Sequence, residues 1–125
     1  MKSFTDIEQS ERLDKILSPE SADMRWRYNH NTHKHDDIPQ MLTVRNWDDP
    51  YNKDIPCWSL TALIDAMKFD FNLEKFEFDQ SDYFTYSVVF ELEQTKIRTR
   101  EHENAIDACY EMILKLHEQE YELKY

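Results

Sequence analysis

The sequence predicts an α+β fold in which helices pack on one face of an antiparallel meander sheet of three to four strands. Apolar residues recur at helical spacing over residues 59–68 and 105–119, and they alternate with polar residues over 83–93. Such an alternation is typical of an antiparallel sheet with one solvated face. The 125 residues suit one compact unit, so we expect a single small domain over 1–125.

The first element is predicted to be a helix over about residues 6–17. Thr5 and Glu8 have the spacing of a capping box, in which each side chain accepts a hydrogen bond from the other residue's backbone N–H. Ser18 and Pro19 then suit the start of one helical turn over 19–23, because the first position of a helix does not need the N–H that proline lacks.

Residues 24–56 form the least regular part of the chain. Trp26 and Tyr28 favour a short strand, residues 29–37 are polar and rich in turn formers, and residues 41–44 favour a second brief strand. This connection is long for a compact domain, and long connections are often functional or mobile. We therefore expect residues 24–56 to be a candidate binding segment.

The remaining elements follow from periodicity. We expect a helix over 59–68 with Ser59 as its N-cap, and strands over 69–78, 83–93 and about 96–100. The first of these strands should have a bulge near residues 74–75 or be broken there into two short strands. A final helix over about 105–119 begins after the N-cap Asn104, and its apolar face includes Cys109 and His117.

The hairpin between the last two strands is predicted to turn at residues 94–95, with a longer loop as the alternative because Gln94 and Thr95 do not favour the positive φ of a two-residue turn. That turn sets three facing pairs, which are Glu93 with Lys96, Glu91 with Arg98, and Leu92 with Ile97. Each pair of opposite charges would add roughly 0.2–1 kcal/mol.

The chain contains no glycine. Phosphate-binding loops, dinucleotide-binding turns and the nucleophile elbow of α/β-hydrolases depend on glycine where the backbone turns sharply or approaches a ligand. The sequence therefore disfavours those sites and makes binding a better expectation than catalysis. Tight turns must use other residues that tolerate positive φ, and we expect several such residues among Asn29, Asn31, Asn46, Asn52, Asn72 and the Asp-rich turns.

The charge is strongly acidic. The formal net charge is −11, and residues 69–93 hold seven acidic residues and one basic residue. This balance disfavours direct contact with nucleic acids or acidic membranes and favours a basic protein partner. No segment resembles a signal peptide or a membrane span, and Cys57 and Cys109 lie in apolar helical patterns typical of reduced, buried thiols. We therefore expect a cytoplasmic protein without membrane contact.

Three short segments carry a resemblance: Ser-Ala-Asp-Met-Arg-Trp at 21–26, Ile-Pro-Cys-Trp-Ser-Leu at 55–60, and Ala-Ile-Asp-Ala-Cys-Tyr-Glu-Met-Ile at 105–113. Their order resembles a family of small uncharacterised proteins of Bacteroides-type bacteria and their prophages and mobile elements. That family often has a glycine after the first helix, where this chain has Ser18. The resemblance implies a small α+β domain in a phage or mobile-element setting, and it implies no activity or site residue.

One cluster has the character of metal ligands, and it consists of His30, His33, His35, Asp36 and Asp37. Imidazole and carboxylate groups together suit Zn²⁺ or Mn²⁺, but all five residues lie in one polar loop and no distant pair of ligands completes the set. We expect a solvated histidine-rich loop and no cofactor. Adventitious binding of Zn²⁺ or Ni²⁺ is one alternative, and a metal-dependent hydrolase centred on this cluster is another.

Other reactive or aromatic residues are interpreted first as structural. Cys57, Cys109 and His117 are expected to be packed rather than catalytic, because a thiol in apolar surroundings has a raised pKa. The three tryptophans are expected to anchor loops to the core. The functional alternative is that exposed aromatic rings bind a partner, and its candidates are Trp26, Tyr28 and Trp47.

Together these observations favour a non-enzymatic accessory or interaction protein of phage or mobile-element origin. It would bind another protein through an acidic surface or through residues 24–56. The alternatives are the metal-dependent hydrolase, an acidic mimic of nucleic acid that uses the carboxylates of residues 70–93, and a structural homodimer.

Overall fold

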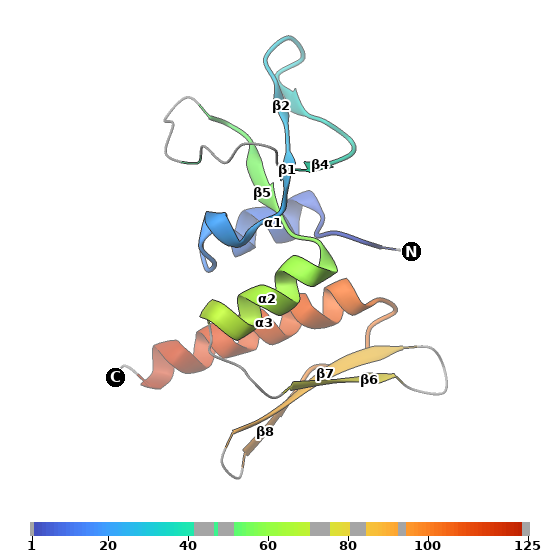
Figure 1. The fold of residues 1–125 in the computed structure, drawn as a ribbon, viewed down its shortest axis with the longest axis vertical. Helices are drawn as coiled ribbons and strands as arrows, with labels where there is room; N and C mark the ends of the chain where they lie inside the picture. Colours follow the sequence, from blue (N-terminus) through green and yellow to red (C-terminus); the bar gives the residue numbers. More distant parts are fainter. Residues whose placement is uncertain are drawn as a thin grey trace.

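The computed structural model of the protein describes residues 2–41, 47, 52–70, 76–80, 85–92 and 95–123. It has the expected α+β architecture, with helices and antiparallel sheets. Figure 1 shows an arm of short strands at the top, helices in the middle and a second sheet at the bottom. The arm is defined here as residues 24–41.

The chain begins with helix α1 (Ile7–Leu13), which is shorter than predicted. Its capping box is formed by Asp6 and Gln9, so the predicted pairing of Thr5 with Glu8 is wrong by one position. The reason is that the Thr5 hydroxyl is buried and accepts a hydrogen bond from the backbone N–H of Trp58 instead. The expected turn after the helix is present as a 3₁₀ helix, η1 (Pro19–Ser21).

The arm is built on a three-stranded antiparallel sheet in the order β4-β1-β5. The central strand β1 (Met24–Trp26) pairs with β4 (Gln40–Met41) on one side and with β5 (Ile55–Cys57) on the other. Further along the arm, β2 (Tyr28–Asn29) and β3 (Lys34–His35) form a hairpin that is a separate two-stranded sheet. The single short strand expected at Trp26 and Tyr28 is divided into β1 and β2, which belong to separate sheets, and the predicted continuation of the next strand to residue 44 lies outside the described residues.

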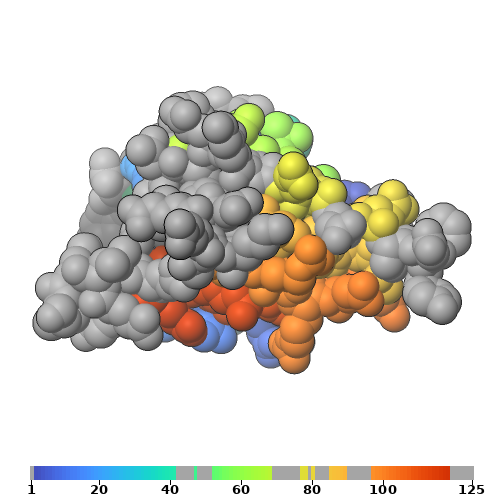
Figure 2. Space-filling model, turned by 90° about the horizontal axis from the view of Figure 1, so that it is seen from below, coloured from blue at the N-terminus to red at the C-terminus, as the bar shows by residue number. Residues whose placement is uncertain are grey.

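The second half of the chain forms a helix pair on a meander sheet. Helix α2 (Leu60–Asp70) is followed by β6 (Phe76–Gln80), β7 (Tyr86–Leu92), β8 (Thr95–Arg98) and α3 (Ala105–Leu123). Ser59 and Asn104 serve as expected at the starts of the helices, since their side chains accept hydrogen bonds from the N–H groups of Ala62 and Asp107. In the view from below, yellow and orange atoms of this sheet lie at the surface (Figure 2).

Two of the predicted details in this half are wrong. The strand predicted from residue 69 is still helical there, because α2 continues to Asp70; the expected bulge lies outside the described residues. In the hairpin of β7 and β8, the observed pairs are Val89 with Arg98, Phe90 with Ile97, Glu91 with Lys96, and Leu92 with Thr95. The true register differs by two residues from the prediction.

One continuous core joins the two halves. Helix α3 packs on β7 and β8, and α2 packs on α3. Trp58, which is fully buried between the arm and α2, belongs to the same cluster as Leu13 of α1 and Val88 of β7. The Trp58 indole Nε1 donates a hydrogen bond to the Ser21 hydroxyl at 2.9 Å. The N-terminal elements are therefore fixed to the helix–sheet half through this tryptophan.

Both cysteines are free and buried, as expected. Cys57 lies on β5 rather than in a helical segment, and burial raises its pKa to about 11. Burial raises the pKa of Cys109, on α3, to about 12. Neither thiol is therefore suited to act as a nucleophile near neutral pH.

The expectation of several Asn or Asp residues at positive φ is wrong for the described part of the chain. There, His33 alone has a positive φ, of 57°. Asn29 instead supports the turn with its side chain, whose oxygen accepts hydrogen bonds from the N–H groups of Asn31 and Thr32. Asn46 and Asn72 lie outside the described residues.

None of the helices described here combines the length and the apolar character needed to cross a membrane. The predicted cytoplasmic location and the single domain over 1–125 stay predictions.

Candidate functional site

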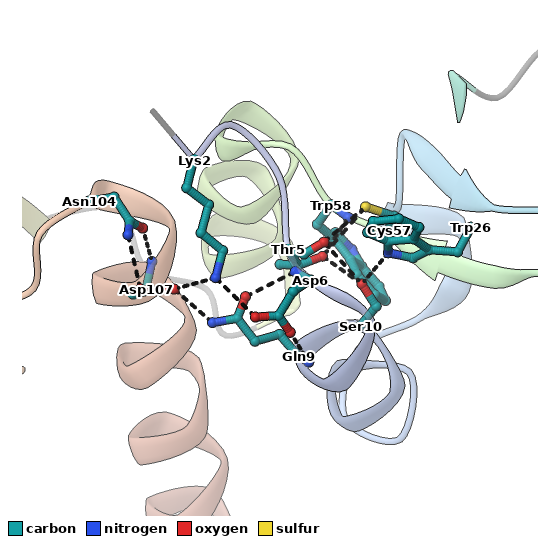
Figure 3. A network of polar contacts seen from close by, with 10 residues as sticks. All are labelled: Lys2, Thr5, Asp6, Gln9, Ser10, Trp26, Cys57, Trp58, Asn104 and Asp107. Carbon is teal, nitrogen blue, oxygen red and sulfur yellow. Dashed lines mark hydrogen bonds and ion pairs between the residues drawn. The ribbon is translucent and has the colours of Figure 1, made fainter. Parts of the chain in front are cut away.

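The base of the arm is anchored by a buried polar network (Figure 3). The indole Nε1 of Trp26 donates to the Ser10 hydroxyl at 3.1 Å, and the Ser10 and Thr5 hydroxyls are 2.8 Å apart. Thr5 is also joined to the backbone of Trp58 by two hydrogen bonds, at 2.9 and 3.1 Å. These side chains are inaccessible or nearly so, and Trp26 is only 5% exposed. Trp26, predicted as a candidate partner-binding residue, is therefore an internal anchor in this structure.

Ion pairs fix the arm above this base. Arg25 Nη1 lies 3.0 Å from Asp54 Oδ2, and the other oxygen of Asp54 accepts the N–H of Tyr28 at 2.8 Å. Further out, Arg27 Nε lies 2.9 Å from Asp36 Oδ2. The arm is thus held to the segment preceding β5 and across its own two sides.

The predicted metal cluster lies in the β2–β3 hairpin, but its members point to other partners. The ring of Tyr28 has edge contacts with His30 and His35, with centroid distances of 5.0 and 5.3 Å. His35 Nε2 is 2.9 Å from the carbonyl oxygen of Lys53, and His33 Nδ1 is 3.4 Å from the Tyr28 hydroxyl.

The fourth predicted ligand, Asp36, is the carboxylate paired with Arg27. Asp37 is exposed at the start of the following loop. All five predicted ligands are described, and among the described residues no group of three or more His, Cys, Asp or Glu is placed to hold a metal ion. The metal-dependent hydrolase stays a prediction, and no arrangement among the described residues favours it.

The outer edge of the arm exposes apolar side chains that the sequence did not single out. Ile38 is 72% exposed and Met41 is 64% exposed. They lie in what we name the 37–41 edge, which consists of Asp37, Ile38, Pro39, Gln40 and Met41. Together with Asp36, the first four of these residues line an open hollow of about 380 Å³.

The remaining predicted binding residues have mixed positions. Tyr28 is half-buried among the histidines and the Lys53 ammonium group, which lies 5.1 Å from its ring centroid. Trp47 is half-buried, and its neighbours at 42–46 and 48–51 lie outside the described residues, so its role stays a prediction. The acidic segment 69–93 is likewise only partly described, and the nucleic-acid mimic stays a prediction.

A second candidate site lies between α1 and α3. Lys2 Nζ is 2.8 Å from Asp107 Oδ1 and 3.1 Å from Asp6 Oδ2, and the Gln9 amide also donates to Asp107 at 2.8 Å (Figure 3). Burial favours the neutral carboxyl of Asp107, but the hydrogen bonds that it accepts outweigh this effect, and its pKa lies below the usual value. Burial also opposes the charge on Lys2, whose two carboxylate partners nevertheless raise its pKa.

Beside this network, Glu111 lies within ion-pair distance of three basic residues, His102, Arg100 and Lys115, the last at 4.0 Å. His102 Nε2 lies 2.9 Å from Glu111 Oε1, and the other Glu111 oxygen accepts the backbone N–H of Arg100 at 2.9 Å. The Arg100 side chain adds a contact at 3.2 Å. Burial acts to raise the pKa of Glu111, but these donors prevail, and the pKa lies below its usual value.

The network around Asp107 and the network around Glu111 both line one hollow of about 420 Å³, which we name the α1–α3 cleft. Its lining includes Lys2, Arg12, Arg100, His102, Tyr110 and Glu111. A smaller adjoining hollow shares Arg12 and includes His117. His117 is exposed there, so its predicted burial on the apolar face of the last helix is wrong. Sequence reasoning missed the cleft because its residues come from segments about a hundred positions apart.

The structure thus offers two candidate sites, an exposed apolar edge on the arm and a charged cleft between two helices. No protein-family model, curated protein or solved structure matches this chain.

Proposed function

We propose that this protein is a non-enzymatic binding protein that holds a protein partner against the 37–41 edge. The observation that carries this function is the exposure of Ile38 and Met41, at 72% and 64%. Among the described residues, the only other exposed large apolar residue is Phe78, which is only 37% exposed. The two side chains lie within four residues of the chain, and they supply the apolar part of the proposed contact.

The energetics favour an anchor of this kind. Burying one large aliphatic side chain contributes roughly 1.5–3 kcal/mol. Methionine adapts its shape to the surface that it meets, because its side chain is unbranched and flexible. Ile38 would therefore fill a pocket in the partner while Met41 adjusts beside it.

The negative charge of this chain indicates which residues should surround the apolar pocket of the partner. Asp37 is exposed next to Ile38, and the whole chain has a formal net charge of −11. A partner with lysine or arginine residues around an apolar pocket would be attracted over long range and oriented on contact. The proposed partner is thus a protein with a basic surface that surrounds an apolar depression.

Site-specific photo-crosslinking tests this function. A photoreactive phenylalanine derivative replaces Ile38 in one variant and Thr61 in a matched control, because Thr61 is exposed on α2 outside the arm. We expect one protein to be captured from position 38 and not from position 61, and an excess of untagged wild-type chain should prevent the capture. The same capture from both positions, or capture that wild-type chain does not prevent, would contradict the proposal.

A second step makes the test quantitative. The captured protein, purified on its own, should bind the wild-type chain, and the Ile38→Asp variant should bind it at least about tenfold more weakly, which corresponds to a loss of about 1.4 kcal/mol. Thr61→Asp serves as the control that introduces the same charge elsewhere.

A further inference from the structure

We propose that the α1–α3 cleft binds a small ligand with two or more anionic groups, phosphoryl or carboxylate. The cleft is a different surface from the 37–41 edge, and this site is independent of the proposed protein binding. Its volume of about 420 Å³ falls within the range of roughly 300–1,000 Å³ that is usual for small-molecule sites.

The carboxylates in the cleft already have partners within the protein. Both oxygens of Asp107 accept hydrogen bonds, from Lys2 and Gln9 on one side and from the Asn104 amide on the other. Both oxygens of Asp6 are also bonded, one by the backbone N–H of Gln9 and the other by Lys2.

Glu111 is occupied in the same way. Its two oxygens form hydrogen bonds with the His102 ring, the Arg100 side chain and the Arg100 backbone N–H. The acceptors of the cleft are therefore largely used, and a ligand rich in donors would find few of them free.

Donors, in contrast, remain in excess. A guanidinium carries five N–H donors. Arg12 lines the cleft, and its guanidinium group makes no hydrogen bond or ion pair with the part of the chain that the structure describes. The Arg100 side chain is 86% exposed, and its contact with Glu111 uses Nε, so its terminal N–H groups have no partner among the described residues.

These two arginines come from separate elements. Arg12 belongs to α1, and Arg100 lies between β8 and α3, so they approach the cleft from different segments. Planar guanidinium groups match phosphate and carboxylate oxygens in pairs. Tyr110 and Leu114 complete the lining with an aromatic ring and an aliphatic side chain. The lining can therefore supply two guanidinium groups for an anion, and an aromatic ring and an aliphatic side chain for the body of a small molecule.

The electrostatic setting supports an anion here more than elsewhere on the molecule. Lys2, Arg12 and Arg100 balance the three carboxylates of the cleft lining, whereas the chain as a whole has a net charge of −11. An approaching anion therefore meets less repulsion at the cleft than at an average position on the surface.

Calorimetric titration of the whole chain tests the site with two probes, inorganic pyrophosphate and citrate, at constant ionic strength. Pyrophosphate represents phosphoryl ligands, and citrate represents carboxylates. We expect saturable binding of at least one probe, and the stronger of the two identifies the class. Arg12→Gln should weaken that binding about tenfold or more, because one charge-assisted pair is lost.

Two further variants complete the test. Arg100→Gln should also weaken binding, whereas Lys68→Gln, which removes an exposed cation of α2 outside the cleft, should leave it unchanged. A thermal unfolding curve of each variant shows that it is folded. The proposal is overturned if neither probe binds at millimolar concentrations, or if Arg12→Gln and Lys68→Gln bind equally well.

Discussion

The base of the arm and its outer edge belong to the same small sheet but have opposite surroundings. At the base, Trp26 is 5% exposed and its ring meets Phe4 edge-on, with centroids 5.8 Å apart. At the edge, Ile38 is 72% exposed and Met41 is 64% exposed. We therefore expect substitutions at the base to lower the free energy of unfolding, and substitutions at the edge to weaken the proposed partner binding instead.

The physical reason is the number of independent contacts at each place. The base is fixed by hydrogen bonds to Ser10 and Thr5 and by the pairing of β1 with β5. The edge strand β4 pairs with β1 over only two residues. A partner can therefore bury the edge without disturbing the packed interior.

The largest effect is expected where the base meets the core. Trp58→Ala should lower the free energy of unfolding by about 3–5 kcal/mol, because it leaves a large cavity in a fully buried position. Urea unfolding followed by circular dichroism measures this loss. Trp58→Phe should retain part of the stability, and a loss below about 1 kcal/mol for Trp58→Ala would argue against a shared core.

A smaller loss of stability is expected at Trp26, in the base of the arm. Trp26→Phe removes the hydrogen bond to the Ser10 hydroxyl and some buried volume, and we expect a loss of roughly 1–3 kcal/mol. In the Ser10→Ala background the same change should cost less, since the indole no longer has its partner. Equal costs in the two backgrounds would show that this hydrogen bond does not anchor the arm.

In the α1–α3 cleft, the contribution of Glu111 to the free energy of unfolding should depend on pH. Because the pKa of Glu111 is lowered in the folded chain, its contribution to stability is present above the usual value of 4.5 and is lost as the pH falls through the lower folded value. Glu111→Gln should therefore lower the free energy of unfolding by roughly 0.5–1.5 kcal/mol near neutral pH and flatten its decline below about pH 4.5.

Unfolding curves recorded from about pH 3 to 7 measure this difference. Glu103→Gln is the matched control, because Glu103 is exposed and precedes the same helix. If the two variants have the same pH dependence, the hydrogen bonds of Glu111 do not stabilise the folded chain.

The smallest effect is expected at the edge itself. Ile38→Asp and Met41→Asp should each change the free energy of unfolding by no more than about 0.5 kcal/mol, because neither side chain is packed. Leu63→Asn, at a fully buried position of α2, is the contrasting variant and should lower the free energy of unfolding by roughly 2–4 kcal/mol. A loss of several kcal/mol at Ile38 would mean that the edge is part of the core.

Elements with a clear period were predictable from sequence. The spacing of apolar residues indicated α2 and α3, and alternation indicated β7, because in each the buried face repeats over several turns or residues. The hairpin register was not predictable by the same means. A shift of two residues keeps every side chain on its face, and Glu91 has a basic residue opposite in either register.

The sites depended on contacts that local patterns do not contain. Thr5 does not cap the first helix as predicted, because its hydroxyl accepts a hydrogen bond from the backbone N–H of Trp58. Lys2 donates a hydrogen bond to Asp107, which lies 105 positions further along the chain. The 37–41 edge was missed for a different reason. An isolated isoleucine or methionine in a polar segment gives no periodic signal, and only its exposure in the fold makes it a candidate for the proposed contact.

The most direct test of an anchored base with a free binding edge is the affinity of the purified crosslinked partner for the Ile38→Asp chain. Affinity should fall at least about tenfold in a variant whose unfolding midpoint equals that of the wild type. Unchanged affinity in the folded variant would contradict the assignment of binding to the 37–41 edge.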